Sequence, residues 1–284
     1  MVFLGIDGGG SKTSFLLEDE AGAELGRVET GPSNWLSTGQ DEARRNIASG
    51  IAQLKTLPRI VGAGFAGAGR PEGIHFYRDC LANLLPNAKL FVETDAFISY
   101  AGAIGLKPGV LLIAGTGSIA IGRRRNGAMI RVGGWGPIFS DDGSGFWIGR
   151  EVIRAALSAN DAGVAPKFVA SVCKALRIQS ITDVSGAWAA GTLTVQSVAS
   201  LTTLVLANPA TDHAKRILGQ AASHLRSLTQ LAIARVGLPQ CRLSIAGSIA
   251  SHPLIRKRIR MKFSNPDHPP EKGAIIWARS QARH

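Results

Sequence analysis

The stretch Asp7-Gly8-Gly9-Gly10-Ser11-Lys12-Thr13 lies between two short apolar runs near the start of the chain. This pattern predicts a strand, a glycine-rich turn and a second strand. Glycine has no Cβ, so the backbone can turn tightly there and come close to a bulky anion. Backbone N–H groups, hydroxyls and a lysine are all phosphate donors. The turn is therefore typical of a nucleotide-phosphate site, with contacts expected from Gly9, Gly10, Ser11, Lys12 and Thr13.

Asp7 ends the first predicted strand, directly before the glycines. A carboxylate at this point can hold a divalent cation, and Mg²⁺ keeps several of its waters when it binds a protein. We therefore expect Asp7 to hold Mg²⁺ through water, beside the phosphates of a nucleotide such as ATP.

Two other nucleotide motifs nearly match and are rejected. Gly5–Thr13 resembles a Walker A loop, but Ser11 stands between the last glycine and the lysine, and a strand follows where that motif has a helix. Gly62–Gly67 has the GxGxxG spacing, yet its first half lies in a predicted strand. The next predicted helix begins only near Pro71, so the motif does not lead directly into a helix as a dinucleotide site requires. We interpret these glycines as small residues that let a buried strand pack closely.

The composition is that of an ordinary globular protein of 284 residues, 45% hydrophobic and 18% charged. Cys80, Cys173 and Cys241 are far apart and form neither a zinc motif nor a disulfide framework. No basic leader precedes Asp7, so we expect a cytoplasmic protein without a secretory signal. Residues 184–211 carry no charge, but polar residues interrupt them, so we expect two buried helices rather than a membrane span.

The chain is strongly basic, with a net charge of +12 and a pI near 10.3. Such a surface favours anionic ligands and speeds their capture. The basic residues cluster at Arg123–Arg125 and at Arg256–Lys262, which we interpret as solvated turns and helix faces. Because no aromatic strip interleaves these clusters, we expect no specific nucleic-acid partner.

The predicted elements of the first third follow the order β-β-β-α-β-α-β-α, which favours a mixed sheet with an antiparallel edge. The opening pattern then returns, because Asp7–Ser11 matches Ala114–Ser118 at an offset of 107 residues. We therefore predict an α/β fold of two related domains, 1–108 and 109–284, that face each other across a nucleotide cleft. The rest is mostly helical, and the final helix, at 272–283, is expected to return to the first domain.

Asp95 lies at a predicted strand-to-helix junction. A carboxylate there can face a cleft and act as a general base, or it can cap the helix, a role that Asp fills well. The residues alone leave these two interpretations equal.

An ordered set of short motifs resembles the sugar kinase, actin and heat-shock-70 superfamily. Within it the chain is similar to the N-acetylglucosamine and glucosamine kinases of the BadF/BadG/BcrA/BcrD ATPase family, which includes the activator ATPases of benzoyl-CoA reductase. The motifs that carry the resemblance are Asp7–Thr13, Ser33–Trp35, Thr94–Ala96, Gly115–Ser118, Gly133–Gly136, Ser140–Gly145 and Ala246–Ser248.

The resemblance implies two ribonuclease-H-like, actin-like ATPase domains and transfer of phosphate from ATP to an amino sugar. Asp95 corresponds to the general base that takes the proton from the sugar hydroxyl. The implied sugar contacts are Asn34, Trp35, Gly134, Trp135, Gly136 and Asp141. The implied nucleotide contacts in the second domain are Gly115, Thr116, Gly117 and Ser118 at the phosphates, with Gly247 and Ser248 on the adenosine side. The expected assembly is a homodimer with no membrane partner.

Several alternatives stay open at this point. Gly133–Gly136 is also compatible with a plain glycine-rich turn around a buried aromatic residue, and Gly247-Ser248 with a simple helix start. No single residue identifies a pocket for an N-acetyl group, so glucosamine and N-acetylglucosamine remain alternatives. An activator-type ATPase that drives a partner protein is a second hypothesis, and a sugar-responsive binding module is a third.

Overall fold

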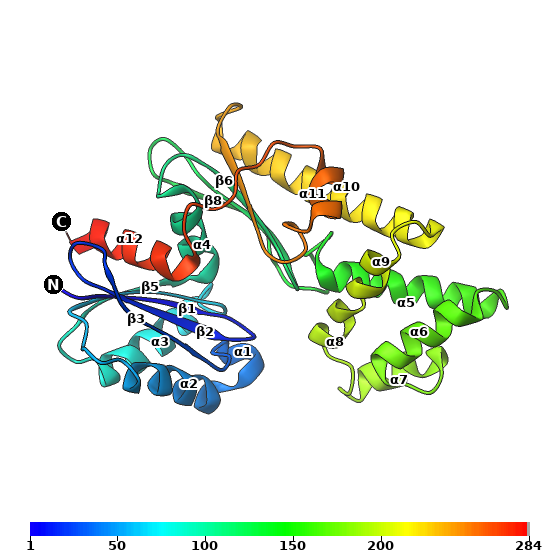
Figure 1. The fold of residues 1–284 in the computed structure, drawn as a ribbon, viewed down its shortest axis with the longest axis horizontal. Coiled ribbons are helices and arrows are strands. Elements are labelled where there is room, and N and C mark those ends of the chain that lie inside the picture. Colours follow the sequence, from blue (N-terminus) through cyan, green and yellow to red (C-terminus); the bar gives the residue numbers. More distant parts are fainter. Residues whose placement is uncertain (283–284) are drawn as a thin grey trace. The chain divides into compact units, whose positions relative to one another are not determined.

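The computed structural model describes residues 1–282, and the chain divides into two compact units. Unit 1 comprises residues 1–108 and 265–284, and unit 2 comprises residues 109–264. Figure 1 shows the elements of both. Each unit is a mixed sheet with helices packed on it, which is the α/β architecture that the sequence predicts.

Unit 1 contains a five-stranded sheet in the order β3-β2-β1-β4-β5. β1 pairs antiparallel with β2 and parallel with β4, so the antiparallel hairpins lie at one edge. The strands are β1 (Phe3–Gly8), β2 (Thr13–Glu18), β3 (Glu24–Thr30), β4 (Ile60–Phe65) and β5 (Lys89–Thr94).

Helices cover both faces of this sheet (Figure 1). Leu4, Ile6 and Phe15 point to one face, where they pack with buried residues of α2 and α3. Phe3 and Leu16 point to the other face, where Ile275 of α12 covers them. The helices are α1 (Trp35–Thr38), α2 (Gln40–Ala52), α3 (Pro71–Leu84), α4 (Asp95–Ile104) and α12 (Pro270–Ala282).

Unit 2 repeats this plan with a four-stranded sheet in the order β8-β7-β6-β9. β6 pairs antiparallel with β7 and parallel with β9. The β1–β2 and β6–β7 hairpins therefore occupy equivalent places, as the repeated sequence pattern predicts. The strands are β6 (Gly109–Ala114), β7 (Ser118–Arg123), β8 (Met129–Gly133) and β9 (Arg242–Ala246).

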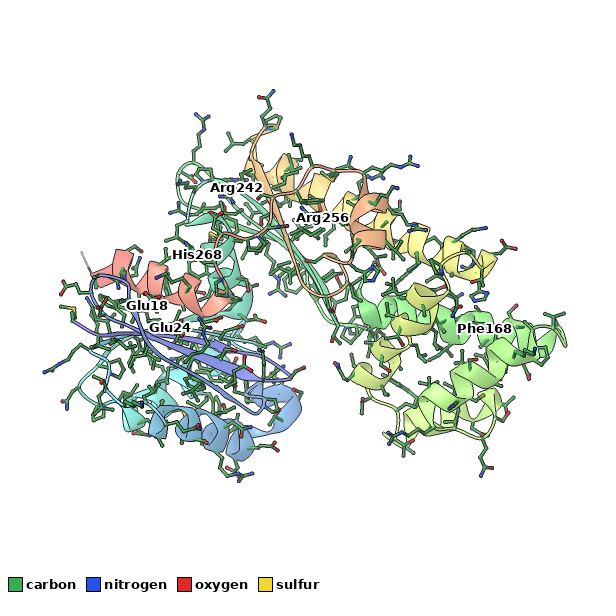
Figure 2. All side chains as sticks on the ribbon, in the orientation of Figure 1. Glu18, Glu24, Phe168, Arg242, Arg256 and His268 are labelled. Carbon is green, nitrogen blue, oxygen red and sulfur yellow. The ribbon has the colours of Figure 1, made fainter. Side chains whose placement is uncertain are left out.

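The long helix α10 (Asp212–Val236) packs on β6, β7 and β8, and its buried residues join both hydrophobic clusters of unit 2. Phe168 of α6, which Figure 2 labels, packs at the edge of the larger cluster. The remaining helices are α5 (Gly145–Asp161), α6 (Pro166–Leu176), the 3₁₀ helix η1 (Ile181–Asp183), α7 (Val184–Ala189), α8 (Val195–Ser200), α9 (Thr202–Ala207) and α11 (Pro253–Ile259).

The uncharged stretch 184–211 differs from the sequence prediction of two buried helices. It forms three short helices, α7, α8 and α9. Gly191, with φ of +73°, lies between α7 and α8, and the Thr194 side chain caps the start of α8. Among the described helices, none combines the length and the apolar character that crossing a membrane requires.

Helix α12 approaches the sheet of unit 1 unusually closely. A Cβ on Gly5 would lie 1.9 Å from the carbonyl oxygen of Glu271, and a Cβ on Gly62 would lie 2.1 Å from that of Ala274. Glycine at these two strand positions therefore lets the helix backbone rest on the sheet. Figure 2 shows Glu18, whose carboxylate receives Lys272 from the same helix at 2.6 Å.

We expect Gly5→Ala to destabilise the protein by about 1–3 kcal/mol or more, because the new methyl group collides with backbone that cannot swing away. Gly26→Ala on β3 is the matched control, since no atom lies within 4 Å of a Cβ there. Thermal and denaturant unfolding would measure both variants. Equal stability of the two variants would contradict the close packing of α12.

Candidate functional site

Backbone hydrogen bonds shape the glycine turn of unit 1. The Gly9 N–H donates to the Lys12 carbonyl at 2.9 Å, which closes the turn. The Gly9 carbonyl accepts the N–H groups of Ser33 and Asn34 at 3.0 and 3.2 Å, which ties the turn to the following loop. Gly10 and Ser11 lie exposed at the tip. The tip is thus the part of the turn that is open to a ligand.

Thr13 and Lys12 are already engaged within unit 1. Thr13 is fully buried, and its hydroxyl lies 2.8 Å from both the Gly31 carbonyl and the Ser33 hydroxyl. Lys12 forms an exposed ion pair with Glu29. In this structure Thr13 braces the turn and Lys12 lies beside a carboxylate. Their predicted contacts with phosphate stay predictions.

Asp7 lies in an acidic and half-buried environment. β1, β4 and β5 are parallel, so their carboxyl ends share one edge of the sheet, where Asp7 lies and Asp95 begins α4. Burial, together with the neighbouring charges of Asp95 and Glu271, raises the pKa of Asp7 to about 7. Because a cation would relieve this repulsion, Asp7 fits a divalent metal ion held through water, since the described residues contain no group of three metal-ligating side chains that could hold the ion directly.

Asp95 is the first residue of α4 and does not cap it. The cap is Thr94, whose hydroxyl oxygen accepts the Phe97 N–H at 3.2 Å. The Asp95 carboxylate is half-buried, and its Oδ1 accepts the N–H of Ala96 at 2.8 Å. The helix therefore does not depend on Asp95 as its cap, which favours the functional interpretation of this residue.

Asn34 and Trp35 are held at the start of α1. The Asn34 side-chain oxygen accepts the Leu36 N–H at 3.2 Å. The half-buried indole of Trp35 stacks on Phe76, and its Nε1 donates to the Gly67 carbonyl at 3.2 Å. The buried Tyr77 hydroxyl accepts the Trp35 N–H and lies 2.7 Å from the Ser33 carbonyl. Sequence reasoning missed Tyr77, because its place on the apolar face of α3 indicates only a core residue.

The second glycine turn, in unit 2, is braced by the start of α5. The N–H groups of Gly145 and Phe146 donate to the carbonyls of Gly115 and Thr116 at 2.8 and 3.1 Å. The Ser118 hydroxyl donates to the Asp142 carbonyl at 3.0 Å. The turn and the acidic loop before α5 therefore form one local structure.

The two small-residue turns of unit 2 lie side by side. Gly247 has a φ of +88°, and a Cβ there would lie 2.3 Å from the Ala114 carbonyl. That same carbonyl accepts the N–H groups of Ile249 and Ala250. The Ser248 hydroxyl lies 3.8 Å from where a Cβ on Gly115 would be. The structure thus brings the predicted phosphate turn and the predicted adenosine-side turn together.

Asp141 is a buried acid with an unsatisfied atom. It is 8% exposed and has a φ of +63°, a conformation that non-glycine residues rarely adopt. Burial raises the pKa of its carboxyl group, and its Oδ1 has no hydrogen-bond partner. Its Oδ2 lies 2.7 Å from where a Cβ on Gly117 would be, so glycine leaves room for the carboxylate. An orphaned buried oxygen in a strained residue is suited to receive a ligand donor.

Trp135 stands on the loop before Asp141 and is 66% exposed. The Arg131 guanidinium stacks 4.1 Å from the centroid of its ring and donates to the Gly133 and Gly134 carbonyls. The alternative of a turn around a buried aromatic residue is therefore wrong for this loop. Sequence reasoning missed Arg131, because a single arginine on a strand carries no distinctive pattern.

Comparisons with known proteins are consistent with these features. The model of the BadF/BadG/BcrA/BcrD ATPase family matches residues 4–278. An N-acetylmuramic acid/N-acetylglucosamine kinase from Clostridium acetobutylicum is 32% identical, over 98% of each chain. An N-acetyl-D-glucosamine kinase from Dictyostelium discoideum is 33% identical, over 84% of this chain and 81% of its own.

A solved structure from Chromobacterium violaceum, described as a candidate N-acetylglucosamine kinase, has a similar fold. It matches with a TM-score of 0.79 and 24% identity, over 97% of this chain and 98% of its own. The likeness confirms the predicted actin-like ATPase fold.

The raised pKa of Asp7 predicts a pH-dependent stability of the metal-free protein. Because the folded state holds this proton more tightly than the ordinary pKa of 3.8 allows, stability falls as the pH rises from about 4 through about 7. Asp7→Asn removes the charge, so the variant should lose less stability over that range than the parent protein. Melting temperatures between about pH 5 and about pH 8 would measure this.

Asp79→Asn, on the exposed face of α3, is the control and should follow the parent protein. If the melting temperature of Asp7→Asn instead changes with pH as that of the parent protein does, the charged form of Asp7 does not destabilise the folded state.

Proposed function

The chain belongs to the BadF/BadG/BcrA/BcrD ATPase family. We propose that it is an ATP-dependent kinase that phosphorylates the 6-hydroxyl of an amino sugar, and that its preferred sugar is N-acetylglucosamine. Two relatives above 30% identity that act on N-acetylglucosamine by name support this proposal. The observation that carries it is Asp95, a carboxylate at the edge of the sheet beside Asp7, where Thr94 already caps the helix.

In the proposed reaction Asp95 acts as the general base. Its carboxylate accepts the proton of the sugar 6-hydroxyl as that oxygen bonds to the γ-phosphorus of ATP. The bond from the γ-phosphorus to the bridging oxygen breaks, and ADP leaves. Asp7 would hold Mg²⁺ through water, and the bound ion would neutralise charge on the phosphates. The raised pKa of Asp7 supports a cation at that place.

The sugar is assigned to polar and aromatic groups of both units. We assign Asn34 and Trp35 in unit 1, where the α1 cap and the contact with Phe76 hold them in place. In unit 2 the orphaned Oδ1 of Asp141 would accept a hydroxyl or amide proton of the sugar. Trp135 would cover an apolar face of the sugar. Gly134 and Gly136 on either side of it have positive φ angles, which let the loop turn at this point.

The nucleotide is assigned to the glycine turns. In unit 1 the half-buried Gly9, the exposed tip at Gly10 and Ser11, and Lys12 would bind phosphate. In unit 2 the assigned contacts are Gly115, Thr116, Gly117 and Ser118 at the phosphates, with Gly247 and Ser248 at the adenosine. Thr13 acts here by bracing the first turn.

Two alternative functions differ from this proposal, one in its substrate and the other in acting on a partner protein. A glucosamine kinase would use the same residues and the same chemistry. An activator-type ATPase with an iron–sulfur cluster would need accessible thiolates. Cys80 and Cys173 are buried, and burial raises the pKa of all three cysteine thiols, Cys241 included. These environments favour the kinase over the activator.

The kinase proposal predicts that an amino sugar stimulates ADP release in the presence of Mg²⁺. The panel consists of N-acetylglucosamine, glucosamine, N-acetylmuramic acid, N-acetylmannosamine and glucose. N-acetylglucosamine should give the highest kcat/KM, and proton-coupled ³¹P NMR of the product should place the phosphate on O6. Failure of every sugar to stimulate ADP release would refute the kinase function, and a colourless, iron-free preparation would at the same time exclude the activator.

Asp95→Asn should lower kcat by a factor of roughly 10² to 10⁴, because the amide cannot take the hydroxyl proton, while nucleotide binding is retained. Glu93→Gln is the matched control, since Glu93 is a half-buried carboxylate two residues away whose Oε2 accepts the Thr94 N–H. Its kcat should change far less. Steady-state kinetics and a nucleotide-binding titration would measure both variants, and equal losses would count against Asp95 as the base.

A further inference from the structure

The two units differ sharply in charge. Unit 2 contains 19 Lys and Arg against six Asp and Glu, whereas unit 1 contains 13 against 14. Unit 2 therefore carries a net charge of +13 and accounts for the entire basic character of the chain. A concentration of like charge destabilises the folded state by self-repulsion, and it attracts anions.

The charge is most concentrated toward the end of unit 2. From residue 213 to residue 266 the sequence contains ten Lys and Arg and no Asp or Glu. The segment includes the last third of unit 2, from α10 through α11 to its last residues. The segment itself contains no acidic residue, although Lys215 pairs with Asp212 just before it, so its positive charges far outnumber the negative charges within the segment.

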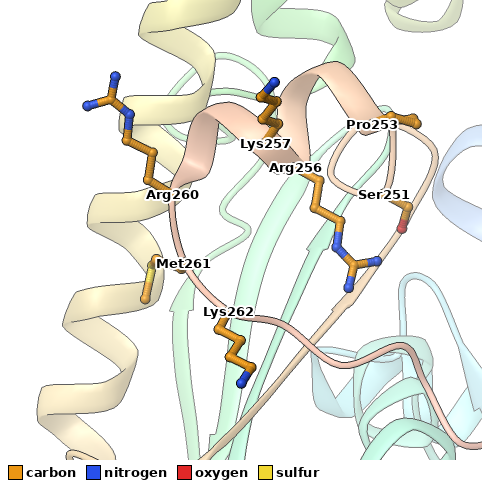
Figure 3. A pocket seen from close by; sticks show the side chains of 7 residues that line it. All are labelled: Ser251, Pro253, Arg256, Lys257, Arg260, Met261 and Lys262. Carbon is orange, nitrogen blue, oxygen red and sulfur yellow. The ribbon is translucent and has the colours of Figure 1, made fainter.

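Part of this segment surrounds a pocket of about 600 Å³, which we call the basic pocket. Figure 3 shows it between α11 and the chain that follows this helix. Lys257, Arg260 and Lys262 are exposed, and Arg256 is half-buried with its guanidinium directed toward Ser251. The lining residues are Ser251, Pro253, Arg256, Lys257, Arg260, Met261 and Lys262.

Hydrogen bonds hold the wall of the basic pocket in place. Arg256 Nη2 donates to the Phe263 carbonyl at 2.6 Å, which joins the helix to the chain that returns beside it. Arg226 of α10 donates to the carbonyls of Ile259 and Arg258 at 2.7 and 3.1 Å. These bonds satisfy carbonyls at the end of α11, so the cations project from a fixed frame.

Arg260 is held in an unfavourable backbone conformation. It ends α11 with a φ of +55° and a ψ of +41°, the left-handed region where glycine is the usual residue. A glycine there would serve the helix end better, yet an exposed arginine occupies the position. The arginine supplies a cation at the basic pocket that a glycine would not supply.

We propose that the basic pocket binds a compact polyanion, a small molecule with two or more phosphate groups. The volume lies within the range of small-molecule sites. The lining offers four cations and the Ser251 hydroxyl, which are phosphate donors, and no carboxylate that would repel one. It contains no aromatic residue on which the bases of single-stranded nucleic acid could stack. This ligand is additional to the ATP and the sugar of the proposed reaction.

The test measures binding of inorganic tripolyphosphate by calorimetry, with the full chain already saturated with a non-hydrolysable ATP analogue. We expect saturable binding that weakens as salt is added. Arg260→Gly should weaken it about tenfold or more, because a charge-assisted contact is lost. The same substitution should leave the melting temperature unchanged or raise it, because it relieves the backbone strain.

Arg177→Gly is the matched control. Arg177 ends α6 with nearly the same dihedral angles, φ of +57° and ψ of +39°, but does not line the basic pocket. Its replacement should affect stability as Arg260→Gly does and leave tripolyphosphate binding intact. Lys262→Gln, which alters no strained residue, should also weaken binding.

Three results would overturn the proposal. The first is no saturable binding once the ATP analogue is present. The second is equal affinity in the parent protein, Arg260→Gly and Arg177→Gly. The third is Arg260-dependent binding of a DNA duplex or of anionic phospholipid vesicles when tripolyphosphate does not bind.

Discussion

The close approach of α12 to β1 and β4 is the constraint on which unit 1 depends. Gly5 and Gly62 have no side chains, and the helix backbone occupies the space that a Cβ would take. This contact joins the end of the chain to its first strand. It also places Glu271 near Asp7, where its charge adds to that of Asp95. Packing of the last helix therefore sets the electrostatic environment of an acid in the first strand.

Local patterns in the sequence predicted much of the fold. The two hairpins, the mixed sheets and the helix that begins at Asp95 follow from glycine turns and apolar periodicity, and all are present. The prediction failed in residues 184–211, where apolar composition indicated two helices and the chain forms three. Composition also indicated burial, but most residues of this stretch are exposed or half-buried, and the breaks between its short helices depend on turns such as the one at Gly191.

The details of the site depend on contacts between residues far apart in the sequence, which local patterns do not contain. Thr13 was expected among the phosphate donors because of its place in the turn, yet its hydroxyl is buried against Gly31 and Ser33. Tyr77 and Arg131 hold the loops of Trp35 and Trp135, and neither stands in a motif. Residue types predict which chemistry is available, and the tertiary structure decides which groups are free to perform it.

Each unit has an unbalanced charge that its own side chains do not cancel. In unit 1, burial and two neighbouring acids make the charged form of Asp7 costly. In unit 2, the segment from 213 to 266 gathers cations without an acid among them. A ligand of opposite charge relieves such a cost only in the folded state, so it stabilises that state by an amount that grows with its concentration above Kd. The two imbalances have opposite signs and call for different ligands, a cation beside Asp7 and an anion at the basic pocket. Stabilisation by Mg²⁺ should therefore depend on the acids of unit 1, and stabilisation by phosphate compounds on the cations of unit 2.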